Sequence, residues 1–369
     1  MQTKLENNRE YGLDLLRGLS MLFVIVIHLV GHGGLGSSYP SASVADLLVS
    51  WVEIASYPAV DCFVLLSGYL LCRLPFKLSR IVRTWTAAFF WSVAIQCVFF
   101  CLRPETVSPG TMLYMFLPVC SERYWFLNAY IVMMIASPVL NRLLRDMPQW
   151  QLRGLLLATL AVFCVAPFFA VGNDIFKTQN GYSFSWFLIL YLWGGYIRLY
   201  CPESSVRNKW KPLLGYTVLV TGHLLWMCLT ENLLPGVSLS GIFMKYTSLP
   251  VFGSALCLLQ FFRSIQIPPD RRTTWLLKRI SPLVFGVYLI HDHPLIRKHL
   301  IQDRFCGAEQ LPLMGAPVTI GAILGIFALC ICLEWLRSLL FRVLRLDAIS
   351  DRLCRKLTDR IVHVLKGKL

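Results

Sequence analysis

Ten apolar runs follow one another along the chain, separated by charged residues or by clusters of Pro and Gly. A helix that crosses the hydrocarbon core of a bilayer needs about 20 consecutive, mostly apolar residues. The runs lie approximately at residues 13–31, 46–72, 81–102, 124–141, 154–171, 183–199, 213–229, 246–262, 281–296 and 314–336. Because no water in lipid can satisfy exposed backbone groups, segments of this length fold as helices. The sequence therefore predicts an all-α, polytopic membrane bundle of about ten transmembrane helices.

The composition excludes an ordinary soluble domain. Of the 369 residues, 56% are apolar and 15% are charged, and the mean hydropathy is +0.60. A net charge of +15 would suggest a nucleic-acid partner in a soluble protein, but here the basic residues lie mostly between the apolar runs. We therefore expect membrane lipids as partners and no nucleic acid.

The cysteines give no evidence of a metal site or a disulfide framework. All 13 are scattered, several of them in the middle of apolar runs, with no pair of CxxC motifs and no His and Cys cluster of zinc spacing. Such cysteines are typical of small buried hydrophobic residues.

The lysines and arginines are distributed unevenly between the predicted loops. If ten runs cross the membrane in turn, most of the 35 Lys and Arg residues fall at the N-terminus, in the C-terminal tail and in alternate loops on the same side. Since cytoplasmic loops carry an excess of Lys and Arg, this pattern predicts that both termini are cytoplasmic. We expect an integral-membrane domain at 1–345 and a basic amphipathic tail at 346–369 along the cytoplasmic leaflet.

The first apolar run carries ionisable residues at both ends. Arg17 and His28 are 11 residues apart, about three helical turns, so both side chains leave one helical face with about 16 Å between them. Asp14 lies one turn before Arg17 and is near enough to pair with it. Ionisable side chains within a membrane segment are costly and indicate a functional site. The alternative is that Arg17 snorkels to the interface and that His28 is an ordinary interfacial histidine.

Arg80 and Arg83 open the third run. They are one helical turn apart, so both guanidinium groups can bind the same phosphate. The alternative is an ordinary positive-inside loop, although Arg83 lies within the apolar run. Near the inner end of the last run, Glu334 is placed to pair with Arg337.

Polar and aromatic side chains interrupt the second run and open the fourth run on its predicted outer side. Asp61 precedes a Ser67-Gly68 pair that is typical of close helix packing, and we expect its carboxyl group to face the bundle interior or an outer cavity. Trp125 and Asn128 open the fourth run. An aromatic belt explains Trp125 without any function, whereas Asn128 within the span is less easily explained.

Histidines recur at the outer end of the ninth run, in the stretch Tyr288 to Pro294. Tyr288 and His291 are three residues apart and share a helical face, so they can line an outer cavity together with His28. His291 and His293 point about 200° apart on a helix, which disfavours binding of one metal by both.

Several of these segments together resemble the integral-membrane acyltransferase 3 group of bacterial sugar O-acyltransferases. The matching pieces, in the family's order, are Leu13 to Leu19 with His28 beyond them, Phe63 to Leu71 with Ser67-Gly68, Arg80 and Arg83, Tyr124 to Leu127 leading to Ser137 to Leu140, Gly194-Gly195, and Gly286 to His291. Each piece is weak alone, whereas the ordered set is specific and covers nearly the whole chain. The chain is most similar to compact members without a fused extracytoplasmic domain.

The resemblance implies a multi-pass protein of the bacterial cytoplasmic (inner) membrane that transfers an acetyl group from cytoplasmic acetyl-CoA. The acceptor would be a hydroxyl of a cell-surface polysaccharide or a lipid-linked sugar. By the same resemblance, His28 is the general base, Arg17 stabilises the acyl donor, and Arg80 and Arg83 hold the CoA phosphates. We expect the acceptor to contact the outer polar and aromatic residues, which are Asp61, Trp125, Asn128, Tyr288 and His291.

Three questions stay open at this point: the acceptor sugar, the length of the acyl group and the oligomeric state. A transporter or flippase of a lipid-linked sugar, with Arg17 and Asp61 as cavity charges, is the alternative function. It predicts broken helices in paired halves of the chain, and it predicts no need for CoA.

Overall fold

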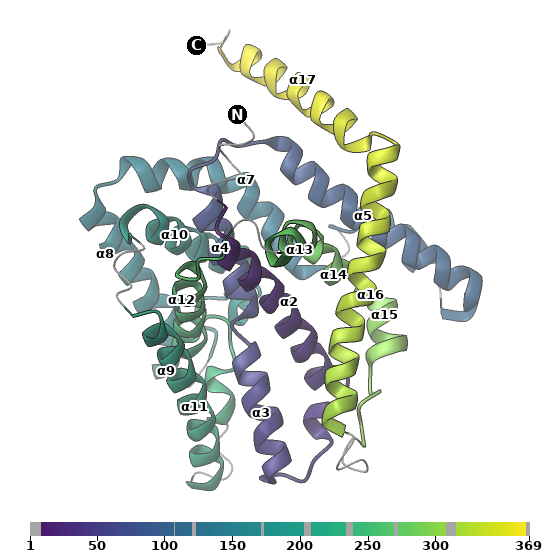
Figure 1. Ribbon diagram of the computed structural model, residues 1–369. Coiled ribbons are helices and arrows are strands. Elements are labelled where there is room, and N and C mark those ends of the chain that lie inside the picture. Colours follow the sequence, from purple (N-terminus) through teal and green to yellow (C-terminus); the bar gives the residue numbers. More distant parts are fainter. Residues whose placement is uncertain are drawn as a thin grey trace.

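The computed structural model describes residues 9–106, 108–119, 123–170, 173–202, 208–233, 239–268, 272–307 and 315–366. Within these ranges the regular structure is helical and includes no strand. The helices form one bundle with α2 (Tyr11–Gly31) in its interior, and α2 begins at the same end of the molecule at which α17 (Leu346–Lys366) lies (Figure 1).

Seven helical segments of the described chain are long and apolar enough to cross a membrane. Five of them are single helices: α2, α5 (Leu78–Leu102), α7 (Trp125–Asp146), α11 (Trp210–Leu233) and α16 (Gly315–Val343). The other two are composite: α3 (Val44–Ser56) with α4 (Ala59–Leu71), and α8 (Gln149–Leu160) with α9 (Ala166–Phe169), the latter pair joined by a π-helical turn at Ala161–Val165.

Three further predicted runs are helical but shorter. They correspond to α10 (Phe184–Tyr200), α12 (Leu249–Arg263) and α14 (Val284–His291), which follows α13 (Arg272–Ile280) and precedes the single turn α15 (Pro294–Ile296). Prolines explain two interruptions, because Pro58 separates α3 from α4 and Pro294 separates α14 from α15. The prediction of helices at all ten runs is confirmed, whereas ten crossings and cytoplasmic termini stay predictions.

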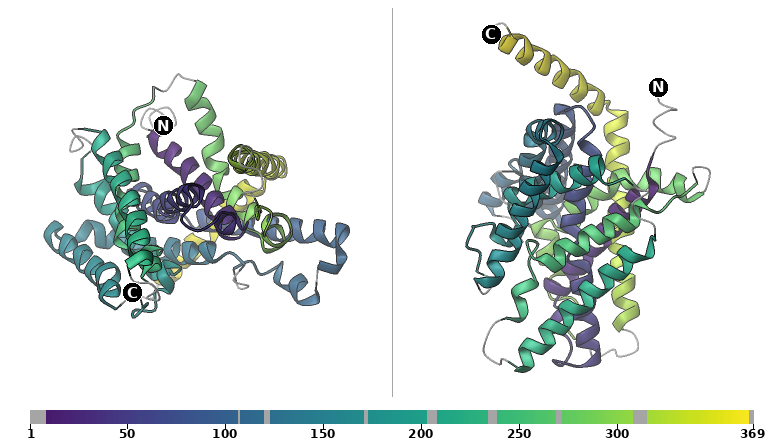
Figure 2. Two further views of the ribbon diagram at one scale, coloured as in Figure 1. Left: turned by 90° about the horizontal axis from the view of Figure 1, so that it is seen from below. Right: turned by 90° about the vertical axis from the view of Figure 1, so that its left-hand side faces the viewer.

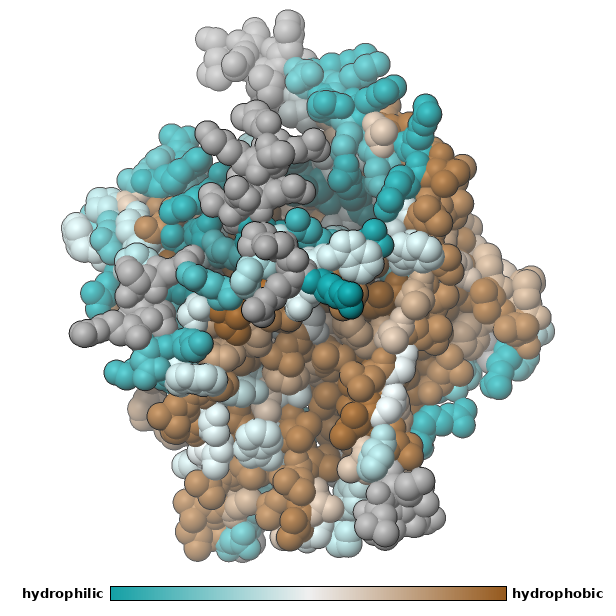
Figure 3. All heavy atoms as spheres, viewed as in Figure 1, coloured by the Kyte–Doolittle hydropathy of each residue, from teal (hydrophilic) through white to brown (hydrophobic). Residues whose placement is uncertain are grey.

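The surface of the bundle is apolar over much of its height. Figure 3 shows hydrophobic residues over the middle and lower parts of one face and hydrophilic residues at the upper end, where α2 begins. Large apolar side chains lie exposed on the outer helices, among them Leu225 of α11, 63% exposed, and Leu329 of α16, 61% exposed. Such a surface is typical of contact with lipid. Beyond it, α17 projects from the bundle (Figure 2).

Two glycines allow α4 and α10 to pack closely. A Cβ atom on Gly68 would lie 2.1 Å from the carbonyl oxygen of Tyr191, and a Cβ atom on Gly194 would lie 2.1 Å from that of Leu65. Each helix therefore presents a glycine to the backbone of the other, as the Ser67-Gly68 pair predicts. The contact fixes α4, whose other face packs against α2 and α12.

We expect Gly68→Ala to destabilise the protein, because the new methyl group must displace the backbone of α10. Overpacking of this kind costs about 1–3 kcal/mol or more, which is measurable as a lower Tm in detergent. Gly222→Ala is the matched control: it lies within α11 with no atom within 4 Å of the added Cβ, so its Tm should stay equal or rise slightly. An unchanged Tm for Gly68→Ala would contradict the packing described here.

Candidate active site

A cavity of about 370 Å³ lies beside the C-terminal half of α2, and we name it the outer cavity because the sequence predicts that this end of α2 faces outward. Its polar and aromatic lining comes from widely separated parts of the chain, namely His28, His32, Glu53, Tyr57, Trp125, Tyr182, Tyr246, Tyr288, Asp292 and Arg297. The cavity thus contains three of the residues that the sequence indicates for catalysis or acceptor binding: His28, Trp125 and Tyr288.

His28 is held by a second histidine. Its Nδ1 atom lies 3.0 Å from Nε2 of His291, and Nδ1 of His291 lies 2.6 Å from the carbonyl oxygen of Val287 in the preceding turn. Because a carbonyl oxygen only accepts, Nδ1 of His291 carries a hydrogen, and Nε2 of the neutral ring is then an acceptor. Nδ1 of His28 donates to it, which leaves Nε2 of His28 unprotonated and able to accept a proton.

Asp292 places a carboxylate next to this pair. Its Oδ1 atom lies 3.7 Å from Nδ1 of His28 and 3.2 Å from Nη1 of Arg297. Asp292 is only 1% exposed, so its charge is balanced mainly by Arg297 and by any positive charge that forms on His28. The carboxylate therefore stabilises the imidazolium form of His28 once it has taken a proton.

Four aromatic rings form one wall of the outer cavity. The ring of Trp125 lies 4.4 Å from that of Tyr182, and the ring of Tyr246 lies 4.9 Å from Tyr182 and 5.1 Å from Tyr57, between ring centroids. Glu53 lies one helical turn before Tyr57 and also lines the cavity. Aromatic faces with a few polar groups are typical of sites that bind and orient a small ligand.

The other predicted acceptor residues are placed differently. Tyr288 lines the cavity, and its buried hydroxyl has no hydrogen-bond partner among the described residues. Asp61 is fully buried, accepts a hydrogen bond from Nε1 of Trp186 at 3.1 Å and lines no cavity described here. Of the two positions expected for this carboxyl group, the structure has the bundle interior and not the outer cavity, because the packing of α4 against α10 encloses Asp61. Asn128 and His291 likewise do not line the outer cavity, although His291 contacts His28.

His293 points away from this site. Its Nδ1 atom accepts from the backbone N–H of Leu295 at 3.2 Å, so the two neighbouring histidines have different partners. Among the described residues, no group of three His, Cys, Asp or Glu side chains has the geometry of a metal site.

An inner cavity of about 330 Å³ lies at the N-terminal half of α2 and contains Arg17, Arg83, Glu334 and Arg337. Arg17 donates to Ser281 at 2.7 Å, and its Nη1 atom lies 3.4 Å from Oδ1 of Asp14. The predicted pairing of Asp14 with Arg17 is confirmed. Ser281 in turn donates to Asp14 at 2.6 Å, so the three side chains hold one another beside the cavity.

Three phenylalanines line both cavities: Phe63 of α4, Phe126 of α7 and Phe285 of α14. We name them the phenylalanine partition. Arg17 lines the cavity on one side of it, and His28 lines the cavity on the other. The two cavities therefore meet at these three side chains.

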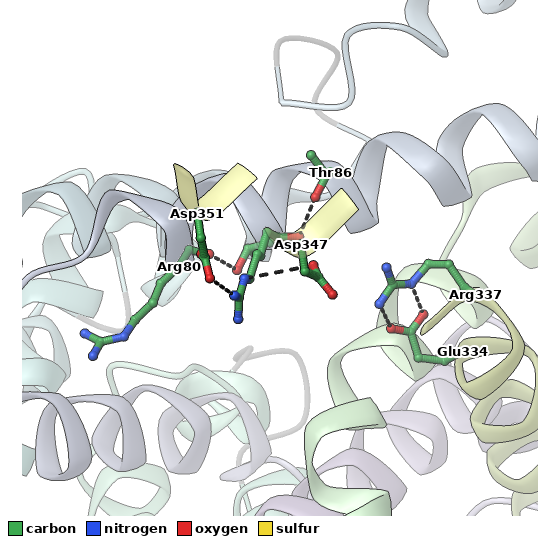
Figure 4. A network of polar contacts seen from close by, with 8 residues as sticks. Arg80, Thr86, Glu334, Arg337, Asp347 and Asp351 are labelled. Atoms are coloured by element: carbon green, nitrogen blue, oxygen red, sulfur yellow. Dashed lines mark hydrogen bonds and ion pairs between the residues drawn. The ribbon is translucent and has the colours of Figure 1, made fainter. Parts of the chain in front are cut away.

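Arg83 also lines a third space, a hollow of about 350 Å³ between the start of α5 and α17. Asp351 of α17 forms an ion pair with Arg83, and Oδ1 of Asp347 lies 3.9 Å from its Nε atom. Figure 4 shows Asp347 and Asp351 beside the start of α5. Arg80 lines the same hollow but donates to the carbonyl oxygen of Pro75 at 2.9 Å. The two arginines thus border one hollow, and Asp351 of α17 already forms an ion pair with one of them, Arg83.

Glu334 is bound on two sides. It accepts from Nε1 of Trp91 at 2.7 Å and from Nη2 and Nε of Arg337 at 2.6 and 2.9 Å, and this pair stands apart from the contacts of α17 in Figure 4. The predicted Glu334–Arg337 pair is confirmed.

The comparison with protein families decides which proteins the chain is related to. The family model Acyl_transf_3, described as an acyltransferase domain, matches residues 10–335. The chain belongs to the acyltransferase 3 family. Its apolar helices and this family together indicate a multi-pass membrane acyltransferase. No curated protein and no solved structure matches the chain.

The family match places the site within the acyltransferase domain. The matched range includes the phenylalanine partition, the lining of the outer cavity and that of the inner cavity except for Arg337, whereas α17 lies beyond it. Sequence reasoning missed Asp292, Glu53, Tyr182 and Tyr246. Asp292 stands between the two histidines singled out in the ninth run, which is the one sequence observation that could have pointed to it.

We expect Glu334→Gln to lower the Tm markedly, because it leaves the buried Arg337 without a counter-ion. Removing one partner of a buried pair costs about 3–5 kcal/mol; the side chains of Glu334 and Arg337 are only 4% and 12% exposed. The control is Asp146→Asn, which breaks an exposed pair with Arg142 and should leave the Tm nearly unchanged. Equal effects of the two variants would contradict the structural role of Glu334.

Proposed function

We propose that this membrane acyltransferase is CoA-dependent and moves an acetyl group from cytoplasmic acetyl-CoA to a hydroxyl of a cell-surface polysaccharide or a lipid-linked sugar. The observation that carries the proposal is the pair of cavities that meet at the phenylalanine partition. One cavity contains arginines suited to an anionic donor, and the other contains a histidine with a free Nε2 atom.

The donor enters on the side of the inner cavity. Its phosphates bind Arg80 and Arg83 in the hollow between α5 and α17, since guanidinium groups match phosphate oxygens in geometry and charge. Because Arg83 lines both this hollow and the inner cavity, the acyl-bearing arm continues past it toward Arg17. The acyl group then reaches His28 between the rings of the partition.

The acceptor occupies the outer cavity. Its sugar ring lies against the aromatic wall formed by Trp125, Tyr182 and Tyr246, and its hydroxyl groups donate to the carboxylate of Glu53. One hydroxyl is thereby held beside Nε2 of His28. Desolvation by the apolar lining strengthens these polar contacts.

The reaction follows from this placement. Nε2 of His28 takes the proton of the acceptor hydroxyl while its oxygen attacks the thioester carbonyl carbon, and Asp292 stabilises the resulting imidazolium. The unpartnered hydroxyl of Tyr288 donates to the oxygen that becomes negative. When the C–S bond breaks, the proton passes from His28 to the CoA thiolate. Arg17, which lines the inner cavity, contacts the donor.

Transport of a lipid-linked sugar is the competing function, and its predicted cavity charges were Arg17 and Asp61. Asp61 is fully buried against Trp186 and lines neither cavity. Since the chain also belongs to an acyltransferase family, we do not propose transport.

The direct test uses purified protein in nanodiscs with radiolabelled acetyl-CoA and a membrane extract as the source of acceptors. His28→Ala should lower acceptor-dependent CoA release by about 10²- to 10⁴-fold, because no other base takes the proton. CoA binding should stay within about twofold of the wild type, since the mutated ring lies beyond the partition from the arginines. His299→Ala, a histidine that lines no cavity described here, is the control. A wild-type protein that binds no CoA would overturn the proposal.

Asp351→Asn should increase the affinity for CoA by about two- to fivefold, because it releases Arg83 from an ion pair whose side chains are 48% and 33% exposed. Binding measured by isothermal titration at low salt checks this. Asp359→Asn removes the same charge from the same hollow without releasing Arg83, so its gain should be smaller. Equal gains in CoA affinity for the two variants would show that the overall charge of the hollow controls donor binding, and not the release of the Arg83 guanidinium.

A further inference from the structure

A separate basic cavity lies at the end of the bundle where α2 begins. It measures about 530 Å³ and lies between the first residues of α2 and the ends of α4, α10 and α12. Its lining includes Arg9, Arg73, Arg198 and Arg263 together with Glu10. It shares no lining residue with the outer cavity, the inner cavity or the hollow beside α17.

Two of the four arginines already have carboxylate partners. Arg9 donates to Asp14 at 2.6 Å, and Arg198 forms an ion pair with Glu10 and donates to the hydroxyl of Tyr69 at 2.7 Å. These two charges are balanced within the protein, so they do not require a ligand.

The other two arginines form no ion pair with any carboxylate of the described residues. Arg73 stands exposed at the rim and donates only to the backbone oxygen of Arg198, at 3.4 Å. Arg263 is 3% exposed; its Nη1 and Nη2 atoms donate to the backbone oxygens of Cys201 and Pro202, and its buried Nε atom has no partner. A buried cation without a counter-ion is strongly unfavourable, so the cavity is suited to an anion.

We propose that this cavity is a binding site for a phosphate group, carried either by a nucleotide or by an anionic lipid headgroup. The positive charges of Arg73 and Arg263 favour a phosphate group, which is negatively charged in both a monoester and a diester. A guanidinium with a free N–H also fits phosphate oxygens better than an ammonium group does. The site is independent of the acyl-transfer proposal, because it uses none of the same residues.

The test measures Tm in nanodiscs of phosphatidylcholine alone, since a ligand that binds only the folded state raises Tm. Three probes are compared: sodium phosphate against sodium chloride of equal ionic strength, coenzyme A, and phosphatidylglycerol added to the nanodisc. All proteins in the coenzyme A arm carry both Arg80→Gln and Arg83→Gln, so that the proposed donor site does not contribute. We expect at least one probe to raise the Tm, and Arg263→Gln to abolish that rise.

Arg73→Gln provides a second variant, because Arg263 also ties the end of α10 to α12 whereas Arg73 is an exposed side chain at the rim. Arg73→Gln should lower the affinity for the probe that raises the Tm by about tenfold, which is the effect of one lost charge-assisted hydrogen bond. A response to coenzyme A identifies a nucleotide, and a response to phosphatidylglycerol identifies a lipid headgroup. The inference is overturned if no probe raises the Tm of the parent protein, or if the rise is undiminished in both variants. The Tm test measures phosphate binding and not catalysis, so its outcomes do not depend on whether the protein transfers an acyl group.

Discussion

Inside an apolar bundle, a charged or polar side chain is costly unless it has a partner, and this constraint governs much of the structure. Asp14 binds Arg17 and Ser281, Glu334 binds Trp91 and Arg337, and His28 binds His291. Each contact joins helices that are distant in the sequence or fixes a side chain beside a cavity. The interactions that make the polar groups tolerable in the bundle therefore also hold the candidate catalytic groups in place.

The same contacts divide the interior of the acyltransferase domain into two chambers. Arginines and Glu334 line one chamber, the histidine and the aromatic wall line the other, and Phe63, Phe126 and Phe285 line both. A reaction between a donor from one side of a membrane and an acceptor from the other requires such an arrangement. If the proposed function holds, the partition would keep water and the acceptor from the donor until the thioester enters, which would limit wasteful hydrolysis.

The sequence predicts what depends on local periodicity. It gives the helical runs, the Asp14–Arg17 and Glu334–Arg337 pairs, and the close packing at Gly68, because these follow from spacings of three or four residues or from small side chains. It does not give the aromatic wall, because Tyr57, Trp125, Tyr182 and Tyr246 come from four separate segments and meet only through tertiary packing.

Long-range contacts also explain the remaining differences from the sequence predictions. Asp61 interrupts an apolar run, as a cavity charge would, yet Trp186 of α10 covers it. Arg83 is suited to a phosphate, yet Asp351 reaches it from 268 residues further along the chain. Neither partner is visible in the local pattern, because each arrives through the packing of a different helix.

The central claim is that the donor reaches His28 through the phenylalanine partition. The most direct measurement is an experimental structure of the protein in nanodiscs with a non-hydrolysable acetyl-CoA analogue. The account predicts phosphates at Arg80 and Arg83, Asp351 displaced from Arg83, and the acyl carbonyl between Phe63, Phe126 and Phe285 on the path to His28. An analogue bound with its acyl group on the lipid-facing surface, or wholly within the outer cavity, would contradict it.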